Sequence, residues 1–317
     1  MIDKRLFSAT SLAIVGNLNR DVSLRGLPVS PRLFKDGETS VESIVETIGG
    51  GGANSACAAA ALGARVRFLG KVGADALGQR LRQVMEAHGV QTSLVSDPNC
   101  RTGTTVALGW KNGQRHFLSC LPNNQRLNFE DLHLSALKGC AHLLRADVWF
   151  SESMLEEGNQ RLFLEARRRG MITSLDINFD PCWSGGAQAQ IARRKRLLRQ
   201  SLGAVDIAHG NVRELCLFTG SPNLETALRR LGDCGVKAAV IHLGNKGAGY
   251  WADGHLLVEP PCFARRVVHS TGTGDILSVC MVLLHAQKEL TIREKLRLSN
   301  RVARDFIEDR LPMIPTL

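Results

Sequence analysis

A glycine-punctuated turn that ends in an aspartate, at residues 270–275, carries the clearest chemical signal in the sequence. It reads Ser-Thr-Gly-Thr-Gly-Asp, follows two valines at 267–268 and precedes an apolar run at 276–284. This pattern predicts the end of a strand, a turn and a helix. The free N–H groups at a helix start bind anions, because the helix dipole favours negative charge there. A carboxylate at Asp275 would suit phosphoryl transfer to an alcohol, although an ordinary strand–turn–helix connection has the same pattern.

A second glycine-rich stretch, at residues 49–52, precedes Ala53 and Asn54. Glycines allow a backbone to approach a ligand closely, because no β-carbon intervenes. The spacing differs from the dinucleotide-binding Gly-x-Gly-x-x-Gly pattern, and a flexible loop before an alanine-rich helix is the alternative. Asn19 and Asp21 follow the first predicted strand and have the donors and acceptors that sugar hydroxyls need, but both types are also common in turns.

Two further groups follow predicted strands later in the chain. Asn211 and Glu214 are three residues apart at a strand-to-helix junction, where they could orient water around a metal-bound phosphate. The same spacing is typical of a helix N-cap. Gly244 and Gly247 follow the next strand, where they could admit adenine or phosphate, or form a tight turn.

The composition indicates a globular protein. Hydrophobic residues make up 44% and charged residues 22% of 317 residues, which is ordinary for such proteins. We find no apolar run near the roughly 20 residues of a membrane span and no signal peptide, so we expect a cytoplasmic protein without a membrane partner. The nine cysteines show no metal-binding or redox spacing.

The net charge of +10 raises the question of nucleic-acid binding. Much of the excess lies in local groups such as 193–196, and aromatic residues make up only 5%, too few for base-stacking platforms. We therefore expect a solvated helix face and no nucleic-acid partner.

Strands and helices alternate along most of the chain, which predicts a parallel sheet covered on both faces. Strands are expected at 12–15, 66–69, 148–150, 172–177, 205–208 and 238–243, and helices at 53–62, 76–88, 159–169, 188–202, 213–219, 224–234, 275–287 and 292–308. Two β-rich insertions, about 18–47 and 101–121, could pair into a small separate sheet. The second insertion contains Asn112-Gly113, a strong hairpin signal.

Taken together and in order, these pieces resemble the ribokinase-like (PfkB) carbohydrate kinase family. The resemblance runs from about residue 12 to residue 316. It rests on the segments 19–21, 49–54, 70–75, 176–178 with Trp183, 211–214, 243–247 and 271–275, and on Asn300.

The resemblance implies one α/β domain over residues 1–317. It would have three α/β/α layers, a mostly parallel central sheet and a small β-sheet lid formed by the two insertions, with a possible homodimer through the lid. It also implies ATP, Mg²⁺ and a small sugar or polyol substrate. A nucleoside kinase of the same family, or a catalytically silent sugar- or nucleotide-binding relative, is the alternative.

The resemblance also implies roles for individual residues. Asp275 would be the general base, and Gly272, Thr273 and Gly274 would form the anion hole. Residues near the nucleotide or its phosphates would be Asn211, Glu214, His242, Gly244, Gly247, Ser270 and Asn300, with Glu214 reaching the metal through water. The sugar hydroxyls would be held by Asn19, Asp21, Gly50, Gly51 and Asn54.

Four positions depart from the family pattern. His269 replaces an Asp that often helps to bind a monovalent cation, so we do not expect activation by such a cation. His242 replaces a Thr, Gly51 replaces the Lys of ribokinase-type loops, and Asp180 lies where many members have Arg. Arg20 lies beside the predicted sugar residues in the sequence, so a sugar acid or sugar phosphate is also a candidate substrate.

Overall fold

Two sheets organise the chain in a computed structural model that describes residues 3–269 and 271–317. The larger sheet has nine strands in the order β13-β12-β11-β10-β9-β8-β1-β4-β5. Its strands are β1 (Ser11–Val15), β4 (Arg65–Gly73), β5 (Gln91–Asp97), β8 (His142–Arg145), β9 (Ile172–Asp176), β10 (Ile207–Asn211), β11 (Ala238–His242), β12 (Ala248–Ala252) and β13 (His255–Glu259). The pairings that involve β12 are antiparallel and the rest are parallel.

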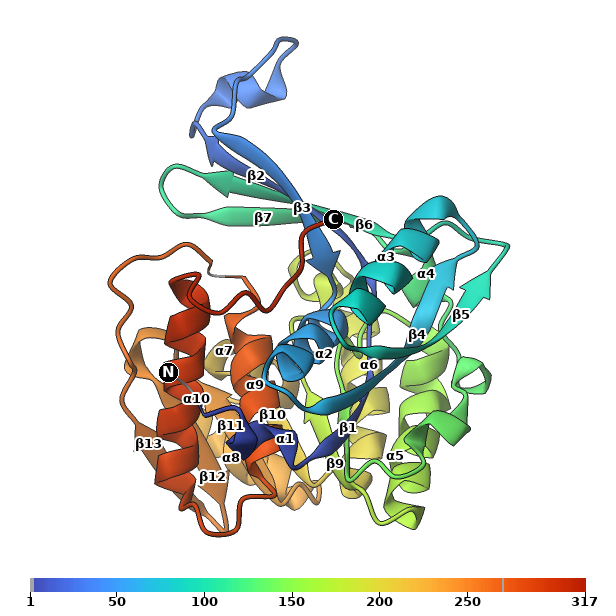
Figure 1. The fold of residues 1–317 in the computed structure, drawn as a ribbon, viewed down its shortest axis with the longest axis vertical. Helices are drawn as coiled ribbons and strands as arrows, with labels where there is room; N and C mark the ends of the chain where they lie inside the picture. The colour runs from blue at the N-terminus through green and yellow to red at the C-terminus, as the bar shows by residue number, and fades with distance from the viewer. Residues whose placement is uncertain (1–2, 270) are drawn as a thin grey trace.

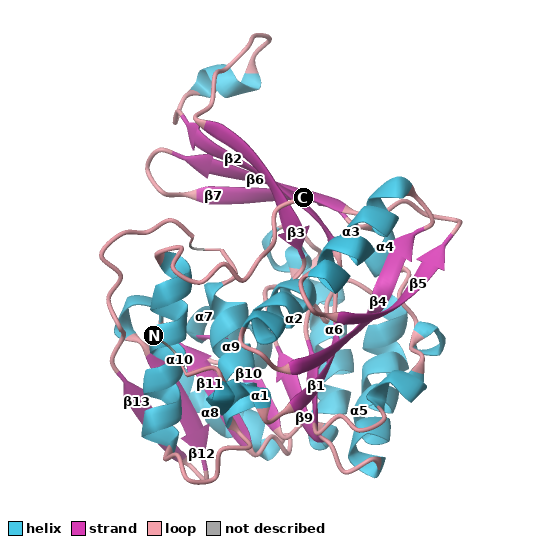
Figure 2. Cartoon of the chain, viewed as in Figure 1, coloured by secondary structure: helices cyan, strands magenta, loops and turns pink. Residues whose placement is uncertain are grey.

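Helices cover both faces of this sheet (Figures 1 and 2). One face packs against α5 (Asn159–Arg168), α6 (Gln188–Ser201), α7 (Val212–Thr219) and α8 (Leu224–Asp233). The other packs against α1 (Arg5–Ser8), α2 (Gly51–Ala61), α3 (Ala76–Ala87), α9 (Thr273–Leu284) and α10 (Ile292–Ile307). The predicted three-layer α/β/α architecture with a mostly parallel sheet is confirmed.

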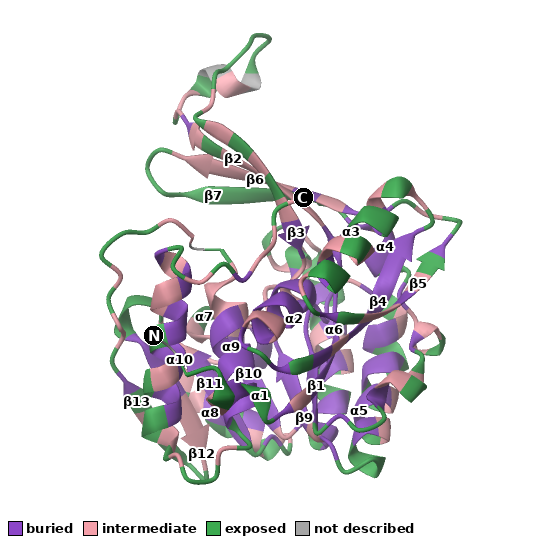
Figure 3. Ribbon diagram, in the orientation of Figure 1, coloured by how far each residue is buried: buried purple, intermediate pink, exposed green. Residues whose placement is uncertain are grey.

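The helices that lead to the site have sequences suited to their surroundings. The end of α9 is apolar on every side and is buried from Ile276 to Leu284, as expected for a helix enclosed by protein. The small residues of α2 let it lie close to β1, and its middle is also buried (Figure 3). By contrast α10 is amphipathic, and its start is fixed by a capping box between Thr291 and Glu294.

The second sheet has four strands in the order β3-β2-β6-β7. They are β2 (Asn19–Leu27), β3 (Ser43–Gly49), β6 (Thr104–Trp110) and β7 (Arg115–Cys120). The two predicted insertions thus pair with each other, and Asn112-Gly113 forms the β6–β7 turn with Gly113 at φ +83°. The sheet projects from the α/β body, and the C-terminal segment runs up to it and pairs with β3 through Thr316 and Thr47 (Figure 1).

Two predicted strands are wrong. Residues 148–150 form a turn in which Val148 and Trp149 are buried, because Asp147 adopts a left-handed φ of +55° that ends the extended chain. The strand is β8, which ends at Arg145. Residues 267–268 form a loop in which Val267 is 71% exposed, because the Val268 N–H donates to the Ile307 carbonyl at the end of α10 instead of to a strand. Among the described residues no helix could cross a membrane.

Candidate active site

Several of the predicted site residues lie where the parallel strands of the large sheet end. The carboxyl end of β1 leads to Asn19 and Asp21, that of β10 ends at Asn211, and that of β11 ends at His242. The N-termini of α2 and α9 meet at the same edge, because a β-carbon on Gly51 would lie 3.2 Å from Asp275 Oδ1. Ligands of open α/β sheets bind at such an edge.

Asn19 and Asp21, at the start of β2, lie against the glycine loop. Asn19 Nδ2 donates to Asp21 Oδ1 at 2.7 Å, and a β-carbon on Gly49 would lie only 2.0 Å from that oxygen. Gly50 has φ +99°, and a β-carbon there would lie 2.3 Å from the carbonyl oxygen of Asn17, so only glycine fits there. Burial raises the pKa of Asp21 to about 7, against the lowering effect of the Asn19 hydrogen bond.

Asn54 contacts the predicted general base. Its Nδ2 donates to Asp275 Oδ2 at 3.2 Å, although the two residues are 221 positions apart. Asn54 is 6% exposed, and its Oδ1 is buried without a hydrogen-bond partner among the described residues. Buried polar atoms are normally paired, so this unpaired oxygen beside Asp275 is consistent with a ligand contact there.

The environment of Asp275 is anionic. Burial raises its pKa to about 8, and the nearby carboxylates of Asp147, Glu214 and Asp21 contribute to the rise, against the lowering effect of the Asn54 hydrogen bond. A raised pKa makes a carboxylate a stronger base once it has lost its proton.

The glycine turn before Asp275 forms the start of α9. Gly272 caps the helix with φ +84°, and the first helical turn leaves N–H groups without intrahelical partners. His242 reaches this turn, because a β-carbon on Gly274 would lie 3.0 Å from its Nδ1. Burial lowers the pKa of His242 to about 4, so its ring is neutral near pH 7. Ser270 lies outside the described residues.

Asn211 and Glu214 form a reciprocal capping box at the start of α7. Glu214 N–H donates to Asn211 Oδ1 at 2.9 Å, and Asn211 N–H donates to Glu214 Oε2 at 2.8 Å. The predicted helix N-cap is therefore confirmed. A role of the pair in ligand binding stays a prediction. Burial raises the pKa of Glu214. It also raises that of Asp176, at the end of β9, with further contributions from Asp275 and Glu214.

Other predicted nucleotide residues make contacts that serve the fold. Asn300 Nδ2 donates to the carbonyl of Pro260 at 2.9 Å, and a β-carbon on Gly247 would lie 2.1 Å from the carbonyl of Glu259. Both therefore hold the chain that leaves β13. Gly244 is exposed and has open space around it. Contact of these three residues with a nucleotide stays a prediction.

The departures from the family pattern have definite partners in the structure. His269 Nε2 lies 3.0 Å from Asp309 Oδ1, and Asp180 accepts from Arg194 Nε at 3.0 Å. Arg20 alternates with Asn19 and Asp21 on β2, and its Nη1 lies 3.5 Å from Glu46. Because neighbouring strand residues point to opposite faces, Arg20 faces away from the predicted sugar residues.

The sequence reasoning missed Asp147. Its carboxylate accepts N–H groups of the glycine loop, and its own N–H donates to Asn178 Oδ1 at 2.9 Å. The wrong strand at 148–150 placed Asp147 before a strand, whereas it lies just after β8. Had β8 been recognised, a carboxylate at its carboxyl end would have been a signal for the site.

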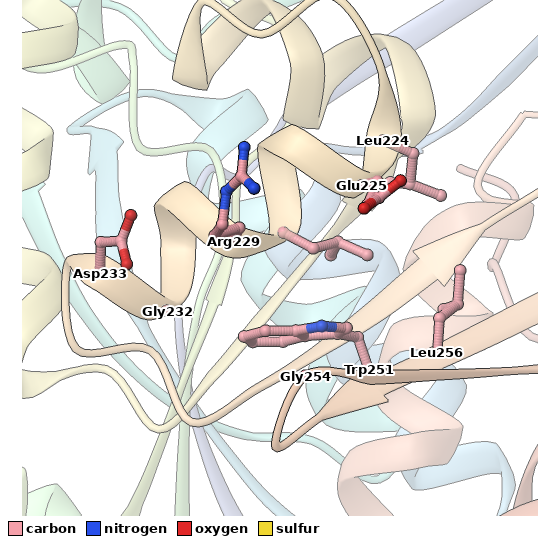
Figure 4. Close-up of a pocket in the computed structure, with 9 residues that line it drawn as sticks. Leu224, Glu225, Arg229, Gly232, Asp233, Trp251, Gly254 and Leu256 are labelled. Atoms are coloured by element: carbon pink, nitrogen blue, oxygen red, sulfur yellow. The ribbon is translucent and has the colours of Figure 1, made fainter.

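A hollow of about 390 Å³ lies elsewhere, between α8 and the β12–β13 hairpin (Figure 4). Trp251 forms its floor below Arg229, and Leu256 lies at one side. None of the predicted site residues lines it, so we place the candidate site at the strand ends.

Comparison with known families agrees with this geometry. Residues 9–314 match the sequence model of the pfkB family carbohydrate kinases. The chain belongs to this family. This pfkB-family kinase is 26% identical over 290 residues to a ribokinase of Arabidopsis thaliana, covering 87% of this chain and 70% of that protein. It is 27% identical over 286 residues to a deoxyribokinase of Salmonella typhi, covering 87% and 86%.

Solved structures share its fold. The structure of Arabidopsis thaliana ribokinase complexed with ribose and ATP superposes with a TM-score of 0.75 at 23% identity, covering 97% of this kinase and 96% of that chain. A putative ribokinase II of E. coli in complex with ATP and Mg²⁺ gives a TM-score of 0.79 at 19% identity, covering 96% and 94%. At these identities the likeness establishes the fold.

Proposed function

We propose that the protein transfers the γ-phosphoryl group of ATP to a hydroxyl of a sugar or polyol, with Asp275 as the general base. One observation carries the proposal. Asp275 lies in the first turn of α9 behind the glycine turn, and Asn54 both donates to it and presents an unpartnered buried oxygen. A base, an anion site and an oxygen that can accept a hydrogen bond from a sugar hydroxyl therefore lie together.

The acceptor binds between the glycine loop and the small sheet. Asn54 Oδ1 accepts one hydroxyl, Asn19 and Asp21 pair with others, and the bare backbone at Gly50 and Gly51 allows the sugar ring to approach. These residues hold the reacting hydroxyl against the Asp275 carboxylate, which supplies the proximity that such a reaction needs.

Asp275 accepts the proton of the hydroxyl as its oxygen attacks the γ-phosphorus. The bond between that phosphorus and the oxygen it shares with the β-phosphate breaks, and ADP leaves. The N–H groups of Gly272, Thr273 and Gly274 stabilise the charge on the phosphoryl oxygens. Positioning and charge stabilisation dominate the catalysis of phosphoryl transfer.

The carboxylates at the strand ends suit Mg²⁺. Asp275 and Glu214 raise the pKa of Asp176, and Glu214 also raises that of Asp275. A bound divalent cation would relieve this repulsion. Among the described residues, no three His, Cys, Asp or Glu side chains are placed to hold a metal by themselves. Mg²⁺ commonly takes most of its ligands from phosphate and water, so Glu214 would hold it through water. When bound, the ion neutralises phosphate charge.

The small sheet acts as the lid of this site. Arg115, at the start of β7, donates to the Thr271 hydroxyl and so joins the sheet to the anion loop. A closed lid excludes water, which would otherwise compete with the sugar for the phosphoryl group. A single domain over 1–317 and a homodimer through the lid strands stay predictions.

The relatives support a sugar acceptor, since they include proteins named ribokinase, fructokinase and deoxyribokinase. A structural neighbour is an adenosine kinase of Sinorhizobium meliloti with a TM-score of 0.77 at 20% identity. That likeness concerns the fold alone, and it makes adenosine a useful competing acceptor in the test.

The test is ADP release from ATP with Mg²⁺, measured with ribose, deoxyribose, fructose and adenosine in separate reactions. We expect turnover that depends on one of the sugars and is lost when excess EDTA removes Mg²⁺. Turnover with adenosine alone would replace the proposal by a nucleoside kinase. ATP binding without turnover on any acceptor would contradict it and favour a catalytically silent relative.

A further inference from the structure

The amide groups at the start of α2 are occupied by a carboxylate of the protein itself. Asp147 Oδ1 accepts the N–H of Gly51 at 3.1 Å, and Oδ2 accepts the N–H of Gly52 at 2.8 Å. Oδ2 also accepts the N–H of Asn17 at 2.9 Å. A helix N-terminus would otherwise attract an anionic ligand. Here Asp147, which is 7% exposed, fills that position.

Two residues in the left-handed backbone conformation place this carboxylate at the glycine loop. Asp147 has φ +55°, and Asn178, which accepts its N–H, has φ +43°. Both lie in the left-handed region, which side chains other than Gly adopt rarely and which Asn and Asp tolerate best. Two strand ends, those of β8 and β9, therefore cooperate to place Asp147 against the glycine loop.

The predicted acceptor site lies against this carboxylate. A β-carbon on Gly51 would lie 2.9 Å from Asp147 Oδ1 and 3.2 Å from Asp275 Oδ1, so the bare Gly51 backbone stands between two carboxylates. Asp21, a third carboxyl group on the acceptor side, also raises the pKa of Asp275.

Arginines near the acceptor residues and Asp147 have partners within the fold. Arg145, two residues before Asp147, is 1% exposed and its Nε donates to Asn159 Oδ1 at 2.8 Å. Arg20 faces away and lies near Glu46. Arg115 reaches Thr271, at the loop that would hold the phosphoryl group rather than the acceptor. An acceptor with its own negative charge would therefore meet the Asp147 carboxylate on the glycine-loop side and find the α2 amides already bonded.

We propose that Asp147 is a positioning and specificity-determining residue, which fixes the glycine loop and restricts the acceptor to uncharged sugars or polyols. The substrate part of this inference rests on the proposed kinase function. It argues against the sugar acid or sugar phosphate that Arg20 suggested from the sequence.

The first test compares matched acceptors on the wild-type enzyme. The sugar with the highest kcat/KM is measured beside its phosphate ester and its aldonic or uronic acid. We expect kcat/KM for the charged compounds to be at least about 100-fold lower, because like charges repel strongly in a partly buried site. Equal or higher kcat/KM for a charged compound would overturn the specificity.

The second test uses Asp147→Asn, which keeps the side-chain size and removes the charge. We expect KM for the neutral sugar to rise, and the ratio of kcat/KM between the neutral and charged compounds to shrink at least about tenfold as the repulsion is removed. Asp253→Asn is the matched control, since Asp253 also has a left-handed φ, of +50°, and is exposed in the β12–β13 turn. An unchanged ratio in Asp147→Asn would overturn the role in specificity.

A third measurement needs no acceptor and so separates this proposal from the proposed function. Amide hydrogen exchange of the segment 49–54 is compared between wild type, Asp147→Asn and Asp253→Asn. We expect exchange at one of Gly51 and Gly52 to accelerate at least about tenfold in Asp147→Asn alone, because Asn has one accepting oxygen where Asp has two, and its NH2 group would face the other amide. Unchanged exchange would overturn the positioning role even if the kinase activity is established.

Discussion

Asp275 carries the chemistry of the site, and its surroundings determine when it can act as a base. Burial and the carboxylates of Asp147, Glu214 and Asp21 raise its pKa to about 8. In the free enzyme it is therefore largely protonated near pH 7, whereas an ordinary aspartate is ionised there.

This pKa predicts the pH dependence of the reaction. A base must be unprotonated to accept the hydroxyl proton, so kcat/KM for the sugar should rise with pH and level off above about 8. Removing a neighbouring negative charge lowers the pKa of a carboxyl group, so Asp147→Asn should move this rise to lower pH. The measurement is kcat/KM across pH for both proteins, at saturating ATP and Mg²⁺. A wild-type profile that is flat from pH 5 to 9 would contradict the assignment.

Single site residues could be predicted where the residue type by itself indicates a chemical role. Asp275, Asn54 and Asp21 have side chains suited to proton transfer or sugar binding, and the structure brings them to one edge. Asn300 has equally suitable chemistry, but its amide holds the Pro260 carbonyl. The sequence does not reveal which partner a polar side chain has, because that partner comes from a distant segment.

Elements were predictable where their hydrophobic pattern was clear. The apolar run after Asp275 predicted α9, and Asn112-Gly113 predicted the β6–β7 hairpin. Strand β8 was not predicted, because two buried polar residues, His142 and Arg145, interrupt its apolar pattern. The apolar residues 148–150 suggested a strand instead, although they lie in a turn.

At the same scale, Arg115 gives a prediction about the lid. Arg115→Ala removes the hydrogen bond between β7 and Thr271, so the lid should close less firmly. We expect kcat for the sugar to fall about tenfold, as for the loss of one hydrogen bond to a charged group, and ATP hydrolysis without sugar to increase relative to transfer. Both rates are obtained by measuring ADP and sugar phosphate in the same reaction.

Lys111→Ala provides the control for this lid variant. Lys111 lies at the β6–β7 turn with a side chain that is 63% exposed, so its loss should leave both rates unchanged. If Arg115→Ala behaves like Lys111→Ala, the contact with Thr271 does not serve catalysis.

At the scale of the whole molecule, alternation of strands and helices predicted the layers, because parallel strands need helical crossovers that cover both faces. It did not predict the antiparallel pairings of β12, since no strands were expected at 248–259; β12 pairs with β11 on one side and with the edge strand β13 on the other. Nor could it predict how the small sheet is oriented, because Arg20 and Asp21 exchange faces with a register change of one residue.

The central claim concerns the molecule as a whole: the fold gathers residues from distant segments at one sheet edge so that Asp275 can activate a sugar hydroxyl. The most direct measurement is turnover of the best sugar by Asp275→Asn, with ATP affinity and thermal unfolding measured on the same protein and Asp253→Asn as the control. We predict a kcat reduced by about 100- to 10,000-fold, as for loss of a general base, with ATP binding and folding retained. Turnover near the wild-type rate in a folded Asp275→Asn protein would contradict the claim.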